Sequence, residues 1–134
     1  QSTSNASSMA QKAAVAALNG DQDCVAKMNE SFKQRHDFVV AGLNAIPGIS
    51  CLPGAGTFYA FADVTGAMAA LGLKDDNAFA DHLLTQAGVA VVAGSGFGAP
   101  GHMRISFATS MELLEKSLQR IGAVIRQASV ARSA

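Results

Sequence analysis

The chain has 134 residues, of which 49% are hydrophobic and 15% are charged, a composition typical of a globular protein with one core. Ten basic residues balance ten acidic ones, so the surplus of Lys and Arg that phosphate binding needs is missing and we expect no nucleic-acid partner. We also expect no membrane contact, since no apolar run approaches the roughly 20 residues of a spanning helix and no basic amphipathic helix is present.

The N-terminal part of the chain is predicted to be helical. A polar segment rich in N-cap residues leads into an alanine-rich helix over Ser8–Leu18, which ends at Asn19–Asp21. A long helix over about Gln22–Ala45 follows, and Pro47 stops it because proline cannot continue a helix. The apolar residues of this second helix recur at helical spacing: Val25, Met28, Phe32, Val39 and Leu43.

Strands and short helices are predicted for the middle of the chain. Turn signals and alternating patterns give these elements: a strand over Ile49–Leu52, a turn over Pro53–Gly56, a strand over Thr57–Asp63, a short helix within residues 64–74, and a helix from Asp75 or Asp76 to about Ala87, with Phe79, Leu83 and Leu84 facing inward. A buried strand over Val89–Val92 follows.

The C-terminal part begins with a glycine loop, "AGSGFGAPG", and continues as a strand. In this strand Met103, Ile105 and Phe107 alternate on one face, while His102, Arg104 and Ser106 alternate on the other. Thr109 and Glu112 form a capping-box pattern that opens a last amphipathic helix through about Gln127. The order of helices and strands predicts an α+β fold, a small and mostly antiparallel sheet covered by helices, with an additional N-terminal helix.

Arg104 is the best candidate for a binding residue. An arginine on the polar face of a strand is usually just solvated, but its guanidinium fork suits a carboxylate through two parallel hydrogen bonds. The adjacent loop contains Gly96-x-Gly98-x-x-Gly101, which formally matches a dinucleotide fingerprint. We reject that function because a strand, and not a helix, follows the motif.

The other polar residues predict no metal site and no catalytic group. His36, His82 and His102 lie on separate elements without ligand spacing. Cys24 and Cys51 are too few for a disulfide framework, so we expect reduced, partly buried thiols in a cytoplasmic protein. Asp63, Asp75 and Asp76 are best explained as strand-end and helix-cap residues.

Several segments in the same order resemble one enzyme family. The segments "QSTSN", "RHDFVVAGLNAIPGISCLPGAGTFYAFADV" and "GVAVVAGSGFGAPGHMRISFATS" are similar to the C-terminal part of bacterial aspartate aminotransferases, which are fold-type-I, class I enzymes that use pyridoxal 5'-phosphate. The resemblance runs from Gln1 to about Gln127. It implies a small domain over residues 21–134, preceded by a lead-in segment and helix over residues 1–20 that belong with the large domain of the parent enzyme.

The resemblance also implies site residues. Arg104 matches the arginine that binds the substrate α-carboxylate, and Phe58 matches a phenylalanine near the substrate. Ser2, Thr3, Ser4 and Asn5 match a segment near the active site and the subunit interface of a homodimer. The parent would transfer an amino group from aspartate or a related amino acid to 2-oxoglutarate, with the small domain closing as a lid over the substrate.

One expected group has no counterpart in the chain. The family's Schiff-base lysine lies in a Ser-Lys-x-x-Ala-type motif, and none of the five lysines of this chain occurs in such a motif: Lys12, Lys27, Lys33, Lys74 and Lys116. We therefore expect the chain to be inactive alone and to lack any catalytic residue of its own. Two alternatives stay open: a stand-alone α+β module that binds a small carboxylate, and a structural or dimerisation piece.

Overall fold

The computed structural model describes residues 4–131, with side chains to Gln127. The chain divides into two compact units, which meet in the sequence between Ser31 and Phe32. The predicted residues Ser2 and Thr3 lie outside the described part. No helix of the described part combines the length and the hydropathy needed to cross a membrane.

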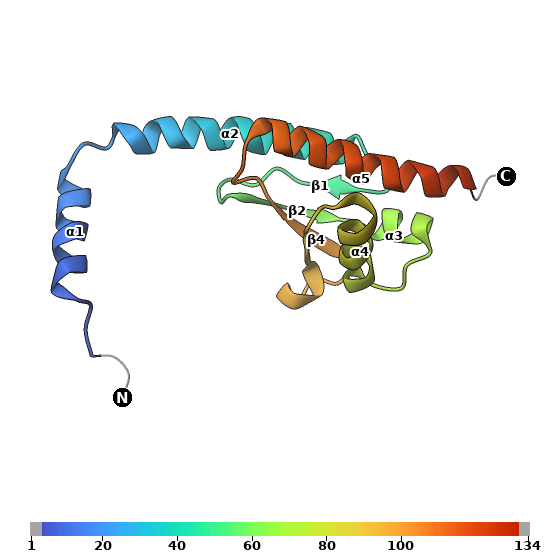
Figure 1. Ribbon diagram of the computed structural model, residues 1–134, viewed down its shortest axis with the longest axis horizontal. Coiled ribbons are helices and arrows are strands. Elements are labelled where there is room, and N and C mark those ends of the chain that lie inside the picture. The colour runs from blue at the N-terminus through green and yellow to red at the C-terminus, as the bar shows by residue number, and fades with distance from the viewer. Residues whose placement is uncertain (1–3, 132–134) are drawn as a thin grey trace. The chain divides into compact units, whose positions relative to one another are not determined.

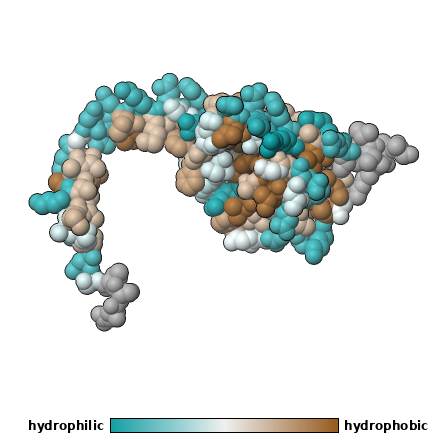
Figure 2. All heavy atoms as spheres, in the orientation of Figure 1, coloured by the Kyte–Doolittle hydropathy of each residue, from teal (hydrophilic) through white to brown (hydrophobic). Residues whose placement is uncertain are grey.

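The first unit consists of helices with no core of their own. Helix α1 spans Ser8–Asn19, as predicted, and begins where the Ser7 hydroxyl accepts a hydrogen bond of 3.2 Å from the Ala10 amide. The first turns of α2 (Asp23–Asn44) complete the unit. Every described residue up to Ser31 is exposed, and the surface of α1 in Figure 2 is largely the pale brown of alanine.

The second unit is built on a four-stranded sheet in which every pairing is antiparallel. The strand order is β1-β2-β4-β3, and the strands span Ser50–Cys51 (β1), Tyr59–Asp63 (β2), Val92–Ala93 (β3) and His102–Ser106 (β4). This arrangement confirms the predicted α+β fold with a small antiparallel sheet. Figure 1 shows β2 and β4 side by side below α5.

Helices cover one face of the sheet. They are the C-terminal part of α2, then α3 (Thr65–Leu71), α4 (Asp76–His82), a π-helical turn η1 (Leu83–Ala87) and α5 (Met111–Ala131). A 3-10 turn, η2 (Gly94–Phe97), lies between β3 and β4 in the chain. The long helix predicted over Gln22–Ala45 is therefore present, and α5 continues past its predicted end near Gln127.

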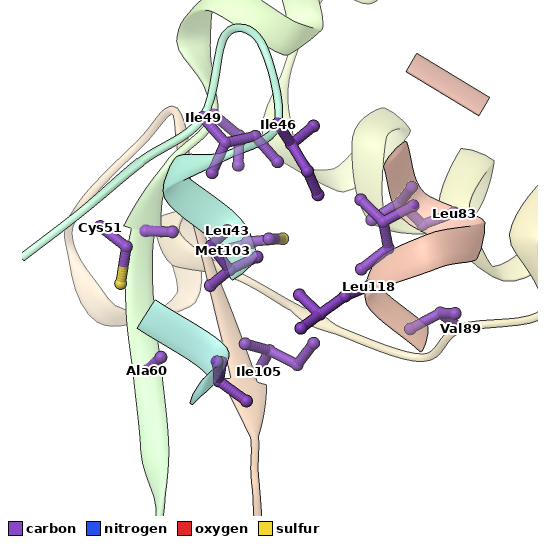
Figure 3. Close-up of a cluster of buried hydrophobic side chains, with 14 of the residues drawn as sticks. Leu43, Ile46, Ile49, Cys51, Ala60, Leu83, Val89, Met103, Ile105 and Leu118 are labelled. Atoms are coloured by element: carbon purple, nitrogen blue, oxygen red, sulfur yellow. The ribbon is translucent and has the colours of Figure 1, made fainter. Parts of the chain in front are cut away.

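The core joins the inner face of the sheet to these helices. Ala60 and Ala62 of β2 and Met103 and Ile105 of β4 are buried at alternate positions, as a half-buried strand requires. They pack in one cluster with α2, α4, η1 and α5, whose buried members include Val39, Leu43, Phe79, Leu83, Leu114, Leu118, Ile121 and Ile125. In Figure 3 the side chains of Leu43, Met103, Ile105 and Leu118 lie together between the sheet and the helices.

Two local contacts, one between backbones and one from a side chain, fix the links between elements. Gly48, after α2, has φ of +81° and accepts a hydrogen bond of 2.9 Å from the Ala67 amide of α3. A Cβ at Gly48 would lie 2.5 Å from the Ala67 nitrogen. Asn44 clamps the edge of β1, since its amide group donates to the Cys51 carbonyl oxygen and accepts from the Cys51 amide at 2.9 and 2.8 Å.

The structure corrects two local predictions on η1 and β3. Leu84 is exposed and not inward-facing, because Phe79, Leu83 and Ala87 already occupy the buried side at spacings of four residues. The strand predicted over Val89–Val92 is displaced to Val92–Ala93, since the Val89 amide donates to the Leu83 carbonyl oxygen and closes the helical turn instead of pairing in the sheet.

Two further predictions are wrong at single residues. Ser110, and not Thr109, caps α5: the Ser110 hydroxyl accepts from the Leu113 amide at 3.3 Å, one residue before the helix begins at Met111. Cys24 is exposed and not partly buried, because it lies in the first unit, whereas Cys51 is buried in β1; both thiols are free.

Candidate functional site

The outer face of β2 and β4 gathers the polar and aromatic side chains that alternate with the core residues. Arg104 stands on this face, as its alternation with Met103 and Ile105 predicts. Its Cα partners are Phe61 on β2 and Val92 on β3, so it occupies a central strand with a neighbour on each side. A central position restricts the base of the side chain and directs the guanidinium away from the core.

Two aromatic rings hold the Arg104 guanidinium. Its Cζ atom lies 4.6 Å from the ring centroid of Phe97 and 5.1 Å from that of Tyr59, both within the range of cation–π attraction. Within the described residues, no carboxylate forms an ion pair with Arg104. The rings therefore restrain the cation but do not use its N–H donors, which stay free for a planar anion.

An aromatic floor beside the guanidinium is formed by three rings, those of Phe61, Phe97 and His102. Phe61 stacks on the His102 ring, with centroids 5.3 Å apart and planes at 15°, and meets the Phe97 ring edge-on at 6.3 Å. These contacts limit the freedom of Phe97, which lies 52% exposed at the end of η2.

The glycine loop places Phe97 on this floor. Residues Gly94–Phe97 form the 3-10 turn η2, which Gly98 closes with φ of +75° by donating its amide to the carbonyl oxygens of Gly94 and Ser95. Gly94 is buried so closely that a Cβ there would lie 2.7 Å from the Cβ of His102. The loop therefore takes the tight, partly left-handed path that its glycines predict, and β4 follows it as expected.

Two side chains of α4 secure the same turn. The Ser95 amide donates a hydrogen bond of 2.6 Å to Oδ2 of Asp76, and the Asn77 side chain donates to the Ser95 hydroxyl at 3.3 Å. The sequence predicted Asp75 or Asp76 as a helix cap. Asp75 is the cap, since its carboxylate accepts from the Ala78 amide at 2.8 Å. The sequence did contain a signal for the different role of Asp76. One helix has one N-cap, so one of the two adjacent aspartates had to do something else.

Phe58 lies at the margin of this cluster. It is 53% exposed, and its ring contacts the Tyr59 ring edge-on, with centroids 5.4 Å apart. The Tyr59 ring also contacts the Arg104 guanidinium. The two predicted substrate-binding residues, Phe58 and Arg104, are therefore linked through Tyr59, which the sequence did not indicate as a site residue. The Phe58 carbonyl oxygen accepts from the Phe107 amide at 2.9 Å, which fixes its backbone to the end of β4.

The backbone before Phe58 is constrained at two points. Thr57 has φ of +75°, an uncommon value for a β-branched residue. Its hydroxyl donates to the Tyr59 carbonyl oxygen and accepts from the Tyr59 amide. Earlier in the loop, the Gly54 amide donates a hydrogen bond of 3.0 Å to Nε2 of His36, so α2 restrains the loop that leads to Phe58.

Three titratable groups have shifted pKa values for plain physical reasons. The hydroxyl and the amide of Thr65 donate to Asp63 and lower the pKa of that carboxyl. Hydrogen bonds from Lys33 and His36 lower the pKa of Asp37. Burial raises the pKa of the Cys51 thiol. None of these groups contacts the Arg104 guanidinium, so they belong to the scaffold.

Other candidate sites are weak. Among residues 4–131 no group of three or more His, Cys, Asp or Glu side chains could hold a metal ion. A hollow of about 460 Å³ lies between η1 and α5, where Arg120 approaches the Ala87 carbonyl oxygen at 3.5 Å. It is open and holds no cluster of reactive groups. Ser4 and Asn5 are exposed and belong to the first unit, so their predicted role stays a prediction.

Comparisons of the sequence with known proteins agree on one family. The family model described as aminotransferase class I and II matches residues 1–121. An aspartate/prephenate aminotransferase of Nitrosomonas europaea is 48% identical over 131 residues, which are 93% of this chain and 33% of that protein. An aspartate aminotransferase of Bacillus subtilis is 44% identical over 120 residues, which are 90% of this chain and 30% of that protein.

Solved structures give the same result. The aspartate aminotransferase of Rhizobium meliloti matches with a TM-score of 0.86 and 45% identity, covering 94% of this chain and 33% of that one. An alanine aminotransferase of Pyrococcus furiosus matches with a TM-score of 0.81 and 36% identity, covering 88% and 30%. The chain therefore spans about a third of the length of these relatives.

Proposed function

Because the chain belongs to the aminotransferase class I and II family, we propose that it is the C-terminal, substrate-carboxylate-binding domain of a pyridoxal-phosphate aminotransferase. In this proposal Arg104 binds the α-carboxylate of the amino-acid or 2-oxo-acid substrate. Phe58 lies beside the substrate. The family membership supports the reaction class, and the geometry around Arg104 supports the role of the residue.

The observation that carries the proposal is the restrained and unpaired guanidinium of Arg104. Phe97 and Tyr59 fix it at 4.6 and 5.1 Å, and no carboxylate of the described chain neutralises it. A guanidinium in this state can form two parallel hydrogen bonds to an incoming carboxylate with little loss of its own freedom. Such a bidentate pair also fixes the direction of the Cα–H bond, which a proton-transfer reaction at Cα requires.

The residues of the chain do not fit the cofactor by themselves. Pyridoxal phosphate supplies an electron sink for a carbanion at Cα when it is bound through a lysine, and the four strands that carry the outer face contain no lysine. Lys33 pairs with Asp37, and Lys74 pairs with Asp75 at 3.8 Å. We therefore propose that the large domain of the longer parent protein holds the cofactor and that this chain alone is inactive.

The names of the relatives support a proposal for the parent reaction. Several are named aspartate aminotransferase, and two are named aspartate/prephenate aminotransferase. We propose that the parent transfers an amino group from aspartate or a related amino acid to 2-oxoglutarate in the cytoplasm. The domain would close over bound substrate as a lid, which excludes water from the reacting atoms.

The first unit suggests what this domain would contact in the parent. Met9 and Leu18 of α1 are 80% and 79% exposed, and α1 buries no residue. Single exposed apolar side chains are common, but a helix that exposes all of its apolar side chains presents the kind of surface that often lies at an interface. We propose that residues 1–20 pack on the large domain and that Ser2 to Asn5 approach the partner subunit of a homodimer, while residues 21–134 form the small domain.

Titration of the chain with L-alanine, L-aspartate and 2-oxoglutarate, followed by NMR of the arginine Nε–Hε groups, tests the role of Arg104. We expect weak binding that shifts the Arg104 signal, and no shift with L-alaninamide, which lacks the carboxylate. Arg104→Lys should weaken binding at least about tenfold, because a hydrogen bond to a charged group contributes about 1.5–3 kcal/mol and lysine cannot bind bidentately.

Arg35 provides the matched control. It also lies over an aromatic ring, with its Cζ atom 5.3 Å from the Phe32 centroid, but on α2. Arg35→Lys should leave carboxylate binding unchanged. An equal response of Arg35 and Arg104 would contradict the proposal, and tight binding lost in Arg104→Ala would favour the stand-alone carboxylate module. A new absorbance band at one equivalent of added pyridoxal phosphate would contradict the assignment of the cofactor to another domain.

A further inference from the structure

The buried carboxylate of Asp76 is not explained by capping. Asp76 is only 3% exposed, and the N-cap of α4 is already provided by Asp75. Removing a carboxylate from water is costly unless strong hydrogen bonds compensate. The short hydrogen bond of 2.6 Å from the Ser95 amide provides that compensation, and charge-assisted bonds of this kind are about twice as strong as neutral ones. The carboxylate is therefore used to hold the backbone of η2.

The turn η2 is held at two neighbouring residues and carries Phe97 beyond them. Gly94 packs against His102 so closely that a side chain would not fit, and the next amide, of Ser95, is bound by Asp76. With these two residues fixed, the single 3-10 turn determines where the Phe97 backbone lies. Movement of Ser95 would therefore move Phe97.

Phe97 in turn restrains Arg104. Its ring is the nearer of the two that hold the guanidinium, at 4.6 Å, and it also meets the Phe61 ring edge-on at 6.3 Å. The long side chain of an arginine has several rotatable bonds, so one fewer ring contact leaves the guanidinium with more orientations. The preferred direction of its donor fork would then be lost.

We propose that Asp76 is a positioning residue for Arg104, acting through the Ser95 amide, the turn η2 and the ring of Phe97. The consequence for binding rests on the proposed function, since it assumes that Arg104 grips a carboxylate. The effect of Asp76 on the position of Phe97 and Arg104 does not rest on the proposed function. Without the Asp76 carboxylate, Phe97 leaves its place over the guanidinium, and Arg104 binds carboxylates less tightly although its own surroundings on β4 are unchanged.

The experiment observes Arg104 directly in the whole chain. The Nε–Hε signal of Arg104, assigned by its loss in Arg104→Lys, should lie upfield because two ring faces shield it. Asp76→Ala should move it downfield towards the position of a solvated arginine. Asp76→Asn keeps an oxygen acceptor without the charge, so its signal should lie between the two. In a Phe97→Leu background, Asp76→Ala should cause no further movement, because both changes act through the same ring.

Asp75→Ala is the matched control, because it removes the cap of α4 and leaves the Asp76–Ser95 bond in place. An unmoved Arg104 signal in this variant supports the inference. A movement equal to that of Asp76→Ala overturns it, since general loosening of α4 would then be the cause. An unmoved signal in a folded Asp76→Ala chain also overturns it. If Asp76→Ala does not fold, Asp76→Asn decides, and an unmoved signal there overturns the inference.

Carboxylate titration separates this inference from the proposed function. If Asp76→Ala moves the Arg104 signal and weakens L-aspartate binding severalfold, the positioning inference and the proposed function are both supported. If the signal moves but wild-type Arg104 does not respond to L-aspartate, 2-oxoglutarate or L-alanine, the positioning stands and the proposed function fails. If wild-type Arg104 responds to the carboxylates and Asp76→Ala leaves both the signal and the binding unchanged, the inference fails alone.

Discussion

Asp63 and Arg104 share the outer face of the sheet but differ in what surrounds them. Asp63 closes β2 with two hydrogen bonds from Thr65, 2.7 Å from the hydroxyl and 2.8 Å from the amide. Arg104 has aromatic rings and no acidic partner in the described chain. A satisfied carboxylate of this kind stabilises the start of a helix, whereas an unpaired and restrained cation is available to a ligand.

The pKa of Asp63 should respond to Thr65→Val. The hydroxyl of Thr65 is the main cause of the lowered pKa and its amide the second, so the variant should raise the pKa part of the way to the usual carboxyl range. Because the folded pKa is the lower one, the stabilisation is complete above the unfolded pKa and is lost as pH falls through the folded pKa. Solvent reaches the group, so the effect on stability should be about 1 kcal/mol or less.

Carboxyl NMR titration measures this pKa. Thr85→Val is the control, because the Thr85 hydroxyl donates to the backbone oxygens of Asp81 and His82 and to no carboxylate. The pKa of Asp63 should be the same in Thr85→Val as in the wild type. An unchanged pKa of Asp63 in Thr65→Val would show that the hydrogen bond from the Thr65 amide is enough to lower the pKa by itself.

Among the elements, α5 contributes the largest set of buried side chains opposite the sheet, and its start is set by Ser110. The residue before it, Thr109, is the one that fits the capping-box pattern in the sequence, because Glu112 follows it at three residues. The two differ because β4 and its exit deliver the chain to the helix with Ser110 in the cap position. Local sequence patterns leave a boundary of this kind uncertain by one residue.

Alanine substitutions at Ser110 and Thr109 should therefore differ in their effect on the free energy of unfolding. We expect Ser110→Ala to lower the free energy of unfolding by about 1 kcal/mol, because the Leu113 amide loses its acceptor. Thr109→Ala should change it by less than about 0.5 kcal/mol. Urea denaturation of both variants gives the comparison, and a larger loss in Thr109→Ala would return the cap to the position that the sequence pattern favoured.

The junction of α2, β1 and α3 depends on one glycine. Gly48→Ala combines the left-handed conformation, which costs a side chain about 1–2 kcal/mol, with a Cβ 2.5 Å from the Ala67 nitrogen and 2.6 Å from the Gly66 carbonyl carbon. Backbone atoms cannot move aside as a flexible side chain can, so we expect a total loss above about 2 kcal/mol.

Gly56→Ala is the matched control for this junction. No atom lies within 4 Å of a Cβ at Gly56, and its φ is not positive, so the change should be within about 0.5 kcal/mol. Both free energies follow from the same urea denaturation series. Equal losses at Gly48 and Gly56 would mean that the close approach to α3 has no energetic role.

At the scale of the whole molecule, stability is concentrated in the second unit. All the buried residues of the described chain lie between Val39 and Ile125, and none lies in residues 4–31. A helix of 12 residues such as α1 is marginal in water without packing. The two units should therefore differ in protection even though one helix, α2, runs through both.

Amide hydrogen exchange measures this difference. In dilute solution the amides of α1 should exchange at nearly unprotected rates, while those of Leu43, Ile105 and Ile121 exchange only through global unfolding. Protection of α1 equal to that of α5 would contradict this picture. Protection of α1 that appears only at high protein concentration would indicate self-association through Met9 and Leu18, in favour of the dimerisation alternative.

Much of the fold was predictable because its causes are local. The helices α1 and α2, the strands β2 and β4 and the alternation around Arg104 follow from residue periodicity, which acts within one turn or one strand. The errors at Leu84, Val89–Val92 and Thr109 all lie where one element passes into the next. At such points the hydrogen bonds of the neighbouring element decide which residue ends a helix or joins a strand.

The sequence by itself determined the class of fold, the family and the face on which Arg104 stands, because alternation and family motifs are properties of contiguous residues. Only the tertiary structure decided what surrounds the guanidinium. Tyr59, Phe97 and Asp76 come from β2, η2 and α4, and no local pattern links them. Their contacts exist because the antiparallel pairing of β2 with β4 and the tether of η2 to α4 bring distant segments to one outer face.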